Sequence, residues 1–222
     1  MLLLAASLTL AACQSGADER DAVPTPAGPS IAETPRADEA PPPSAPSADA
    51  GRLISPNGIG EARVGMTVGA LRAALPGGTT LGPAEPFMVD IAGLPVVHDA
   101  DTLYYALVFS GEPAGEDTPL LSVATRSTAF RTAEGVGPGT TLTEAVAAHG
   151  AATLSYNTND ESREHAAFAG YPHRGVLFRV GAGGSGMAGT YATQGEYNET
   201  TTYAGDARIL LVSVDLGGPV AD

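Results

Sequence analysis

The sequence has no tryptophan, no lysine and only one cysteine, and aromatic residues make up 5% of its 222 positions. A single cysteine cannot form an intramolecular disulfide, which excludes a disulfide-stabilised scaffold. With so few rings, the core has to be built mainly from Val, Leu, Ile and Ala. The 28 glycines and 18 prolines favour a β-containing fold that is rich in turns.

Positive charge is also scarce. All 11 basic residues are arginine, and 25 acidic residues bring the formal net charge to −14. Residues 51–222 alone carry 18 acids and 9 arginines. Such a field repels phosphate backbones and anionic head groups. The composition therefore argues against nucleic-acid binding and against electrostatic attachment to a membrane.

The chain begins with a short apolar run. Residues 2–12 carry no charge, and their length suits a secretion signal better than a bilayer span. The run ends in Leu10-Ala11-Ala12-Cys13. These four residues resemble the lipobox of bacterial lipoproteins, in which the cysteine thiol receives a diacylglyceryl group before cleavage. The alternative is a buried N-terminal helix that happens to end at a cysteine.

The resemblance implies a signal peptide at residues 1–12 and a mature chain that starts with a lipid on Cys13. Two or three acyl chains, such as palmitate, would hold the protein permanently to the cell envelope, since each buried methylene contributes about 0.8 kcal/mol. Basic residues that normally precede the apolar run in this family are missing here. Gln14, rather than Asp, follows the cysteine, which favours the outer membrane, at its periplasmic or surface face.

Residues 13–50 are dominated by Pro, Ala, Ser, Asp and Glu. They offer almost no branched apolar side chains to bury, so we expect a disordered linker. At about 3.1 Å per residue, an extended proline-rich chain could reach roughly 100 Å from the lipid surface. The remaining residues, 51–222, are expected to form a single globular domain.

Within that domain, apolar runs bounded by turn residues predict strands over 103–109, 120–125, 175–180 and 209–214. Two alanine-rich segments, 65–74 and 139–148, each follow a glycine turn and predict short helices. In the second, Thr141 and Glu144 form a capping-box pattern, and Gly150 suits the helix end. Pro76 ends the first.

The two helical segments align with each other when a three-residue gap is allowed in the preceding turn. The sequence thus predicts an α+β domain with a mostly antiparallel sheet, two short helices and a duplicated unit of strand, glycine turn and helix. Chance similarity is the alternative, because Gly and Ala are common in this chain. Residues 130–137 leading into Thr141 also resemble an element of exported bacterial lipoproteins that carries no known activity, which supports only the fold and the compartment.

Few residues suggest chemistry. The four histidines lack the spacing of a zinc site, so we expect no metal and no cofactor. His98, Asp99 and Asp101 fall close together in a predicted turn, and His165 and His173 are further candidates for a polar site. Residues 157–161 resemble the opening of a calcium loop without its glycine, and a solvated polar loop is the alternative. No catalytic residue is predicted.

Tyr191, Tyr197 and Tyr203 recur every six residues, as on a binding face or in the packing of a sheet edge. The sequence favours a lipid-anchored, non-enzymatic protein that binds another macromolecule, such as an envelope protein, or assists envelope assembly. The alternative is a tethered hydrolase or small-ligand-binding protein with its site around the three histidines at 98, 165 and 173. A binder should expose an apolar or tyrosine patch, whereas an enzyme should bring a histidine and carboxylates together in a pocket.

Overall fold

The structure is a computed structural model that describes residues 50–171, 173, 175–183, 186–192 and 195–215. Cys13, the predicted signal segment and the predicted linker up to residue 49 lie outside the described residues. The helices are α1 Val68–Ala74, α2 Leu142–His149 and the short 3-10 turns η1 Ala50–Arg52 and η2 Thr158–Asp160. The strands are β1 Ile54–Ser55, β2 Gly58–Ile59, β3 Ala62–Arg63, β4 Thr79–Leu81, β5 Glu85–Met88, β6 Ile91–His98, β7 Asp101–Phe109, β8 Ser122–Thr125, β9 Ala152–Asn157, β10 Glu164–Phe168, β11 Val176–Gly181, β12 Tyr197–Thr200 and β13 Arg208–Asp215.

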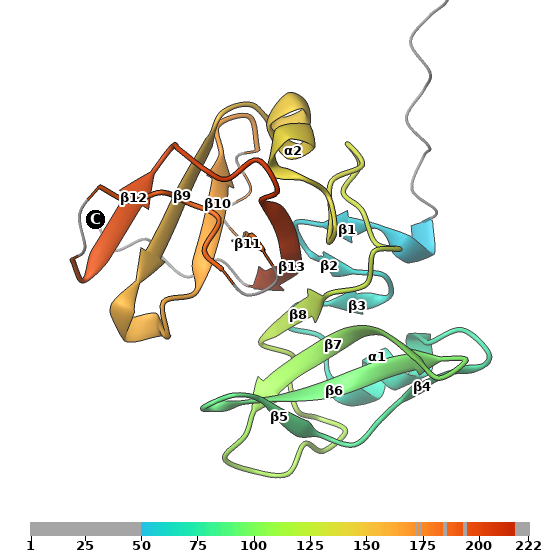
Figure 1. Ribbon diagram of the computed structural model, residues 1–222. Helices are drawn as coiled ribbons and strands as arrows, with labels where there is room; N and C mark the ends of the chain where they lie inside the picture. Colours follow the sequence, from blue (N-terminus) through green and yellow to red (C-terminus); the bar gives the residue numbers. More distant parts are fainter. Residues whose placement is uncertain (1–49, 172, 174, 184–185, 193–194, 216–222) are drawn as a thin grey trace, which may run out of the picture. The chain divides into compact units, whose positions relative to one another are not determined.

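One 10-stranded antiparallel sheet dominates the fold (Figure 1). Its order is β12-β9-β10-β11-β13-β8-β7-β6-β4, and β5 also pairs with β6. A separate small sheet has the order β1-β2-β3. The predicted α+β class, with a mostly antiparallel sheet and two α-helices, is confirmed for the described part of the chain.

Local sequence signals account for the helices. Thr141 caps α2, accepting a hydrogen bond from the Glu144 amide while the Glu144 carboxylate accepts one from the Thr141 amide, so the predicted capping box is confirmed. Gly150 ends this helix with a φ of +81°. The helix α1 ends at Ala74, and the C-cap residue Leu75 has an extended backbone ahead of the proline at position 76.

All four predicted strands are present, but the longest unpredicted strand is β6. Gly93 and Pro95 in its sequence disguise it, because both residues are disfavoured in strands. Gly93 is needed for space, since a Cβ there would lie 2.9 Å from the Tyr105 ring. The Pro95 carbonyl accepts a hydrogen bond from the Gly82 amide, just past the end of β4. In an antiparallel strand, the N–H and the C=O of one residue point toward the same neighbouring strand. Because the Pro95 carbonyl points toward β4, the N–H that proline lacks would not have bonded to β7.

The two halves of the main sheet follow the same plan. In each half a helix precedes a run of four neighbouring strands, β4-β6-β7-β8 after α1 and β9-β10-β11-β13 after α2. Each helix start is also tied to the start of the fourth strand by three matching backbone hydrogen bonds. They are Gly65 N to Leu120 O, Leu120 N to Met66 O and Val68 N to Thr118 O in the first half, and Gly139 N to Ile209 O, Ile209 N to Thr140 O and Leu142 N to Ala207 O in the second.

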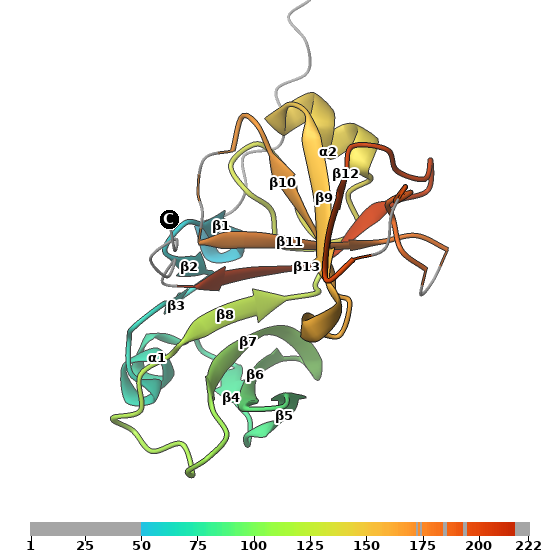
Figure 2. The same cartoon turned by 90° about the vertical axis from the view of Figure 1, so that its left-hand side faces the viewer.

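The halves meet where β8 and β13 run side by side, which Figure 2 shows between β7 and β11. When Leu120 of the first half is matched with Ile209 of the second half, Ala124 becomes equivalent to Ser213. These two equivalent residues pair with each other between β8 and β13. The halves are therefore related by a local two-fold axis between β8 and β13. Descent of both from one duplicated unit stays a prediction.

Side chains on the two faces of the sheet form separate apolar clusters. The larger cluster is the main core and includes buried residues of both α-helices and of β1–β3, such as Leu71, Leu142 and Ile59. The smaller cluster consists of Leu107, Ala124 and Leu211, packed by Phe87, Ile91 and Tyr105. None of the helices in the described part of the chain has the length and apolar character of a membrane span.

Candidate functional site

A cleft of about 360 Å³ opens beside the smaller apolar cluster, a volume typical of small-ligand sites. Three arginines and His165 line it. We call it the arginine cleft. Its lining residues are Phe87, Met88, Leu107, Ser122, Arg126, Asp160, Glu161, Arg163, His165, Leu177, Arg179, Leu211, Ser213 and Asp215.

Strand register places Arg179 in the lining of the cleft, beside His165 and Leu211. Arg179 on β11 lies directly opposite His165 on β10 and Leu211 on β13. Paired residues on neighbouring strands project to the same face, so the three side chains line the cleft together. None of the hydrogen bonds or ion pairs found among the described residues involves the Arg179 guanidinium, although that side chain is half-buried.

Arg163, by contrast, is held by its neighbours. Its guanidinium donates to the Asp160 carboxylate at 3.1 Å and to the Glu161 carboxylate at 2.5 Å. A third contact, 3.0 Å to the Met88 sulfur, joins the second half of the domain to β5 of the first half. Both carboxylates are more than half exposed, so this ion-paired group forms the solvent edge of the cleft.

Arg126 completes the set from the loop after β8. Its guanidinium carbon lies 5.4 Å from the centre of the Phe87 ring, a cation–π contact worth about 0.5–1 kcal/mol at an exposed position. The Phe87 ring in turn packs against Tyr105, with 5.2 Å between ring centres. The rings of Phe87 and Tyr105 form an aromatic wall, and Phe87 stabilises the position of the Arg126 guanidinium.

The positive groups in the cleft crowd one another. Burial lowers the pKa of Arg179, and the neighbouring Arg163 and Arg126 cations lower it further, an effect that Glu161 and Asp160 oppose. Burial also lowers the pKa of His165, an effect that Asp160 opposes and that Arg179 and Arg163 reinforce. This downward shift favours the neutral form of His165. Desolvated cations surrounded by like charge are stabilised by an anion placed between them.

The cleft is not uniformly positive. Asp160, Glu161 and Asp215 also line it, and the first two neutralise Arg163. A long polyanion would meet these carboxylates and the negative charge of the whole chain. A single small anionic group could lie beside Arg179 and Arg126, which have no ion pair among the described residues, so the arrangement suits one compact anion.

The predicted polar group of His98, Asp99 and Asp101 does come together, but at the exposed turn between β6 and β7. The Nδ1 atom of His98 lies 3.0 Å from the Thr79 hydroxyl oxygen, and Nε2 lies 3.4 Å from an Asp99 carboxylate oxygen. Asp99 adopts a φ of +49°, as a tight hairpin turn requires. These side chains face solvent and not the arginine cleft.

His173 and His165 line a second hollow of about 480 Å³. The exposed His173 ring packs edge-on against Tyr171, with 4.9 Å between ring centres. Among the described residues, no hydrogen bond or ion pair joins either histidine to a carboxylate. The structure thus brings two of the three predicted histidines to one hollow, without the histidine–acid contact expected of a hydrolase among the described residues.

The polar side chains of the calcium-like loop, residues 157–161, are hydrogen-bonded or ion-paired within the loop and with Glu196 and Arg163. Asn157 accepts a hydrogen bond from the Asn159 amide, and the Asn159 side chain donates to Glu196 at 2.7 Å. The acids at positions 160 and 161 bind Arg163. No group of three or more His, Cys, Asp or Glu side chains in the described ranges is placed to hold a metal ion. This geometry favours the polar-loop interpretation.

The structure also buries two polar residues that the sequence did not single out, Glu164 and His149. The Glu164 carboxylate accepts hydrogen bonds from the Ala188 and Gly189 amides and from the Tyr191 hydroxyl, at 2.5–2.7 Å. His149 at the end of α2 is equally buried among aromatic rings, and burial lowers its pKa.

Packing accounts for two of the three periodic tyrosines. Tyr191 packs edge-on against Tyr156 and Tyr203 packs against the main core, whereas Tyr197 is exposed.

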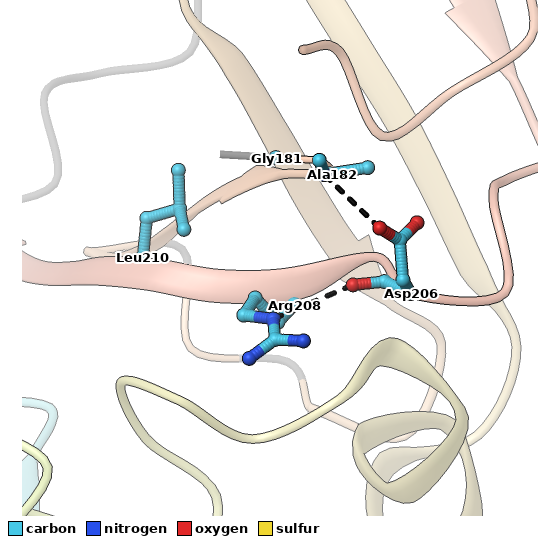
Figure 3. Close-up of a pocket in the computed structure, with 6 residues that line it drawn as sticks. Gly181, Ala182, Asp206, Arg208 and Leu210 are labelled. Carbon is cyan, nitrogen blue, oxygen red and sulfur yellow. Dashed lines mark hydrogen bonds between the residues drawn. The ribbon is translucent and has the colours of Figure 1, made fainter. Parts of the chain in front are cut away.

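Two other hollows offer less chemistry. In the hollow of about 330 Å³ shown in Figure 3, the Asp206 carboxylate accepts a hydrogen bond from the Gly183 amide at 3.1 Å. The Nε atom of Arg208 donates to the Asp206 backbone carbonyl at 3.4 Å. The other hollow, at the β5 edge, is largely apolar and includes Val89 and Phe109, which are 82% and 64% exposed. That exposed apolar surface is of the kind expected at a protein contact.

The arginines of the cleft were not predicted from the sequence. One signal was available: β11 alternates buried and less buried residues, and Arg179 interrupts its otherwise apolar run. Nothing in the sequence indicated that Arg126 and Arg163 would join it.

The chain matches no protein-family model, no curated protein and no solved structure.

Proposed function

We propose that this protein is a lipid-tethered envelope protein that binds, without catalysis, a ligand or partner carrying a compact anionic group. The observation that carries the proposal is the half-buried Arg179 guanidinium, which has no ion-pair partner among the described residues and lies beside two more arginines. Removing a cation from water without a partner costs free energy, so folding alone does not favour it.

The first half of the domain shows which residue the fold accepts at the position equivalent to Arg179. The match between the two halves makes Leu211 on β13 equivalent to Ser122 on β8. Arg179 pairs with Leu211, and Leu107 pairs with Ser122, so Arg179 and Leu107 occupy equivalent positions. Leu107 is buried in the smaller apolar cluster. Since the same architecture accepts leucine at this position, the arginine in the second half is best explained by function.

The binding test compares two substitutions that remove the same charge. Arg179→Gln alters the cleft, and Arg208→Gln alters an exposed arginine on β13 outside it. The purified full chain is titrated with sodium acetate and sodium phosphate against sodium chloride at constant ionic strength, with binding followed by NMR of arginine side chains. We expect saturable binding that Arg179→Gln removes and Arg208→Gln retains. Equal responses to all three salts would refute the anion site.

The tether rests on the resemblance of residues 10–13 to the lipobox. We propose an outer-membrane attachment through Cys13, with the linker holding the domain away from the lipid. Mass spectrometry of the protein from its own host should find acyl chains on an N-terminal Cys13, and Cys13→Ser should release the protein from the membrane fraction. An unmodified thiol at this position would contradict the tether.

An envelope protein is the proposed macromolecular partner, and the exposed Val89 and Phe109 side chains support a protein contact at the β5 edge. Photo-crosslinkers placed at these two positions should capture one partner in native envelopes, whereas a crosslinker at the exposed Asp99 turn should not. Identical adducts from all three positions would argue against a specific surface.

The halves of the domain are proposed to descend from one duplicated unit. The six matched hydrogen bonds and the self-pairing of equivalent positions at Ala124 and Ser213 support this origin. Sequences of related chains would test it, because residues at equivalent positions should become more alike in some of them.

A further inference from the structure

We infer that the ligand of the arginine cleft is an amphiphilic anion, a carboxylate or phosphate head joined to an apolar body. The inference rests on the proposed anion site and specifies the chemistry of the molecule that fills it. Its basis is the unequal chemistry of the two halves of the domain where they meet.

The second half supplies Arg179, a cation without an ion pair among the described residues, and Arg126 adds a second cation from the first half. His165 on β10 and Arg179 on β11 stand opposite each other, and Arg163 adds a third group from the turn before β10. An anionic head placed here could accept hydrogen bonds from the Arg179 guanidinium in a bidentate arrangement.

The first half supplies apolar surface at the equivalent positions. Leu107 is the first-half equivalent of Arg179. Gly93 pairs with Leu107 just as His165 pairs with Arg179, so Gly93 is the equivalent of His165. With no side chain at Gly93, the Phe87 ring covers this site, 3.2 Å from the position a Cβ would take. An aromatic and aliphatic wall therefore faces the cationic one.

The floor between the two walls is apolar as well. Leu211 is almost completely buried, and Leu177 is 38% exposed within the lining of the cleft. Inorganic anions would use only the cationic wall and would leave the exposed part of the Leu177 side chain in water. A molecule with an apolar body would cover it, and each methylene that becomes buried raises affinity about fourfold.

The volume of the cleft, about 360 Å³, lies in the range of small-ligand sites. Because the cleft is open to solvent, part of a ligand can extend beyond it. Octanoate has a suitable size and chemistry and is the probe of choice. Acetate has the same head without the body, and octylammonium has the same body with the opposite charge.

The experiment measures binding of these three probes and of phosphate to the purified full chain by NMR titration in one buffer. We expect octanoate to bind at least tenfold more tightly than acetate, since burial of two methylenes suffices for this ratio. Leu177→Ser should reduce the ratio to about threefold or less. Leu210→Ser is the matched control, because Leu210 is also 38% exposed but lies outside the cleft (Figure 3), and it should leave the ratio unchanged.

The outcomes separate this inference from the proposed function. If octanoate and acetate bind equally well and Arg179→Gln removes both, the anion site stands and the amphiphilic ligand is refuted. If none of the anions binds, the proposed function fails too. Octylammonium binding as tightly as octanoate would show an apolar site without selection for charge, which overturns both. A Leu177→Ser chain that fails to fold is replaced by Phe87→Ser, with the same expected loss of the octanoate preference.

Discussion

Replacing Arg179 by leucine should make the domain more stable while abolishing anion binding. The substitution copies the residue found at the equivalent position of the first half, where Leu107 is buried in the smaller apolar cluster. At position 179 a leucine would lie beside Leu211 and extend this cluster. The change also removes a half-buried cation that has no ion-pair partner among the described residues.

Two contributions set the size of the effect. A leucine that buries about 40 Å² of additional apolar surface contributes about 1 kcal/mol at about 25 cal/mol per Å². Relief of repulsion from Arg163 and Arg126 adds about 0.5 kcal/mol, the scale of partly exposed charge pairs. The variant should therefore be more stable by about 1–2 kcal/mol, and its Tm should rise by about 2–8 °C for a domain of this size.

Urea unfolding followed by circular dichroism measures the free energy, provided that the m-value is unchanged. Arg208→Leu, at an exposed arginine on β13, controls for the loss of charge. A bound anion at ten times its Kd should stabilise the natural chain by about 1.4 kcal/mol and leave Arg179→Leu unaffected. A variant that loses more than about 1 kcal/mol of stability, or one that still responds to the anion, would refute the reasoning.

Three further substitutions test the local structure. Thr141→Ala removes the N-cap of α2 and should cost about 1 kcal/mol in urea unfolding, whereas the exposed Thr143→Ala should change stability by less than about 0.5 kcal/mol; equal effects would contradict the capping box. Glu164→Ala leaves three donors without their acceptor and should cost about 2–4 kcal/mol, so a loss below about 1 kcal/mol would mean that water replaces the carboxylate. Because burial lowers the pKa of His149, the unfolded chain binds its proton more readily, and stability should fall as the pH drops below about 6.5. His149→Phe should weaken this acid sensitivity, and an unchanged pH profile would exclude His149 as its source.

The sequence alone determined those features that depend on contacts within a few residues. The capping box of Thr141 and Glu144 spans a single helical turn, and Pro76 ends α1 wherever the helix lies in the fold. Apolar runs that alternate with turn residues were enough to predict four strands and the α+β class. The acidic composition likewise required no structure, and the lipidation of Cys13 remains a prediction from the lipobox pattern.

Only the tertiary structure decided which strands pair and which side chains meet. Strand β6 was hidden because Gly93 and Pro95 disfavour a strand locally, and its place depends on the Tyr105 and Phe87 rings packed above it. Alternation along a strand tells which residues share a face, but the register with other strands fixes what stands beside them. The arginine cleft belongs to this second class. Arg126, Arg163 and Arg179 lie far apart in the sequence, and they converge only because β8, β13, β11 and β10 are neighbours in the sheet.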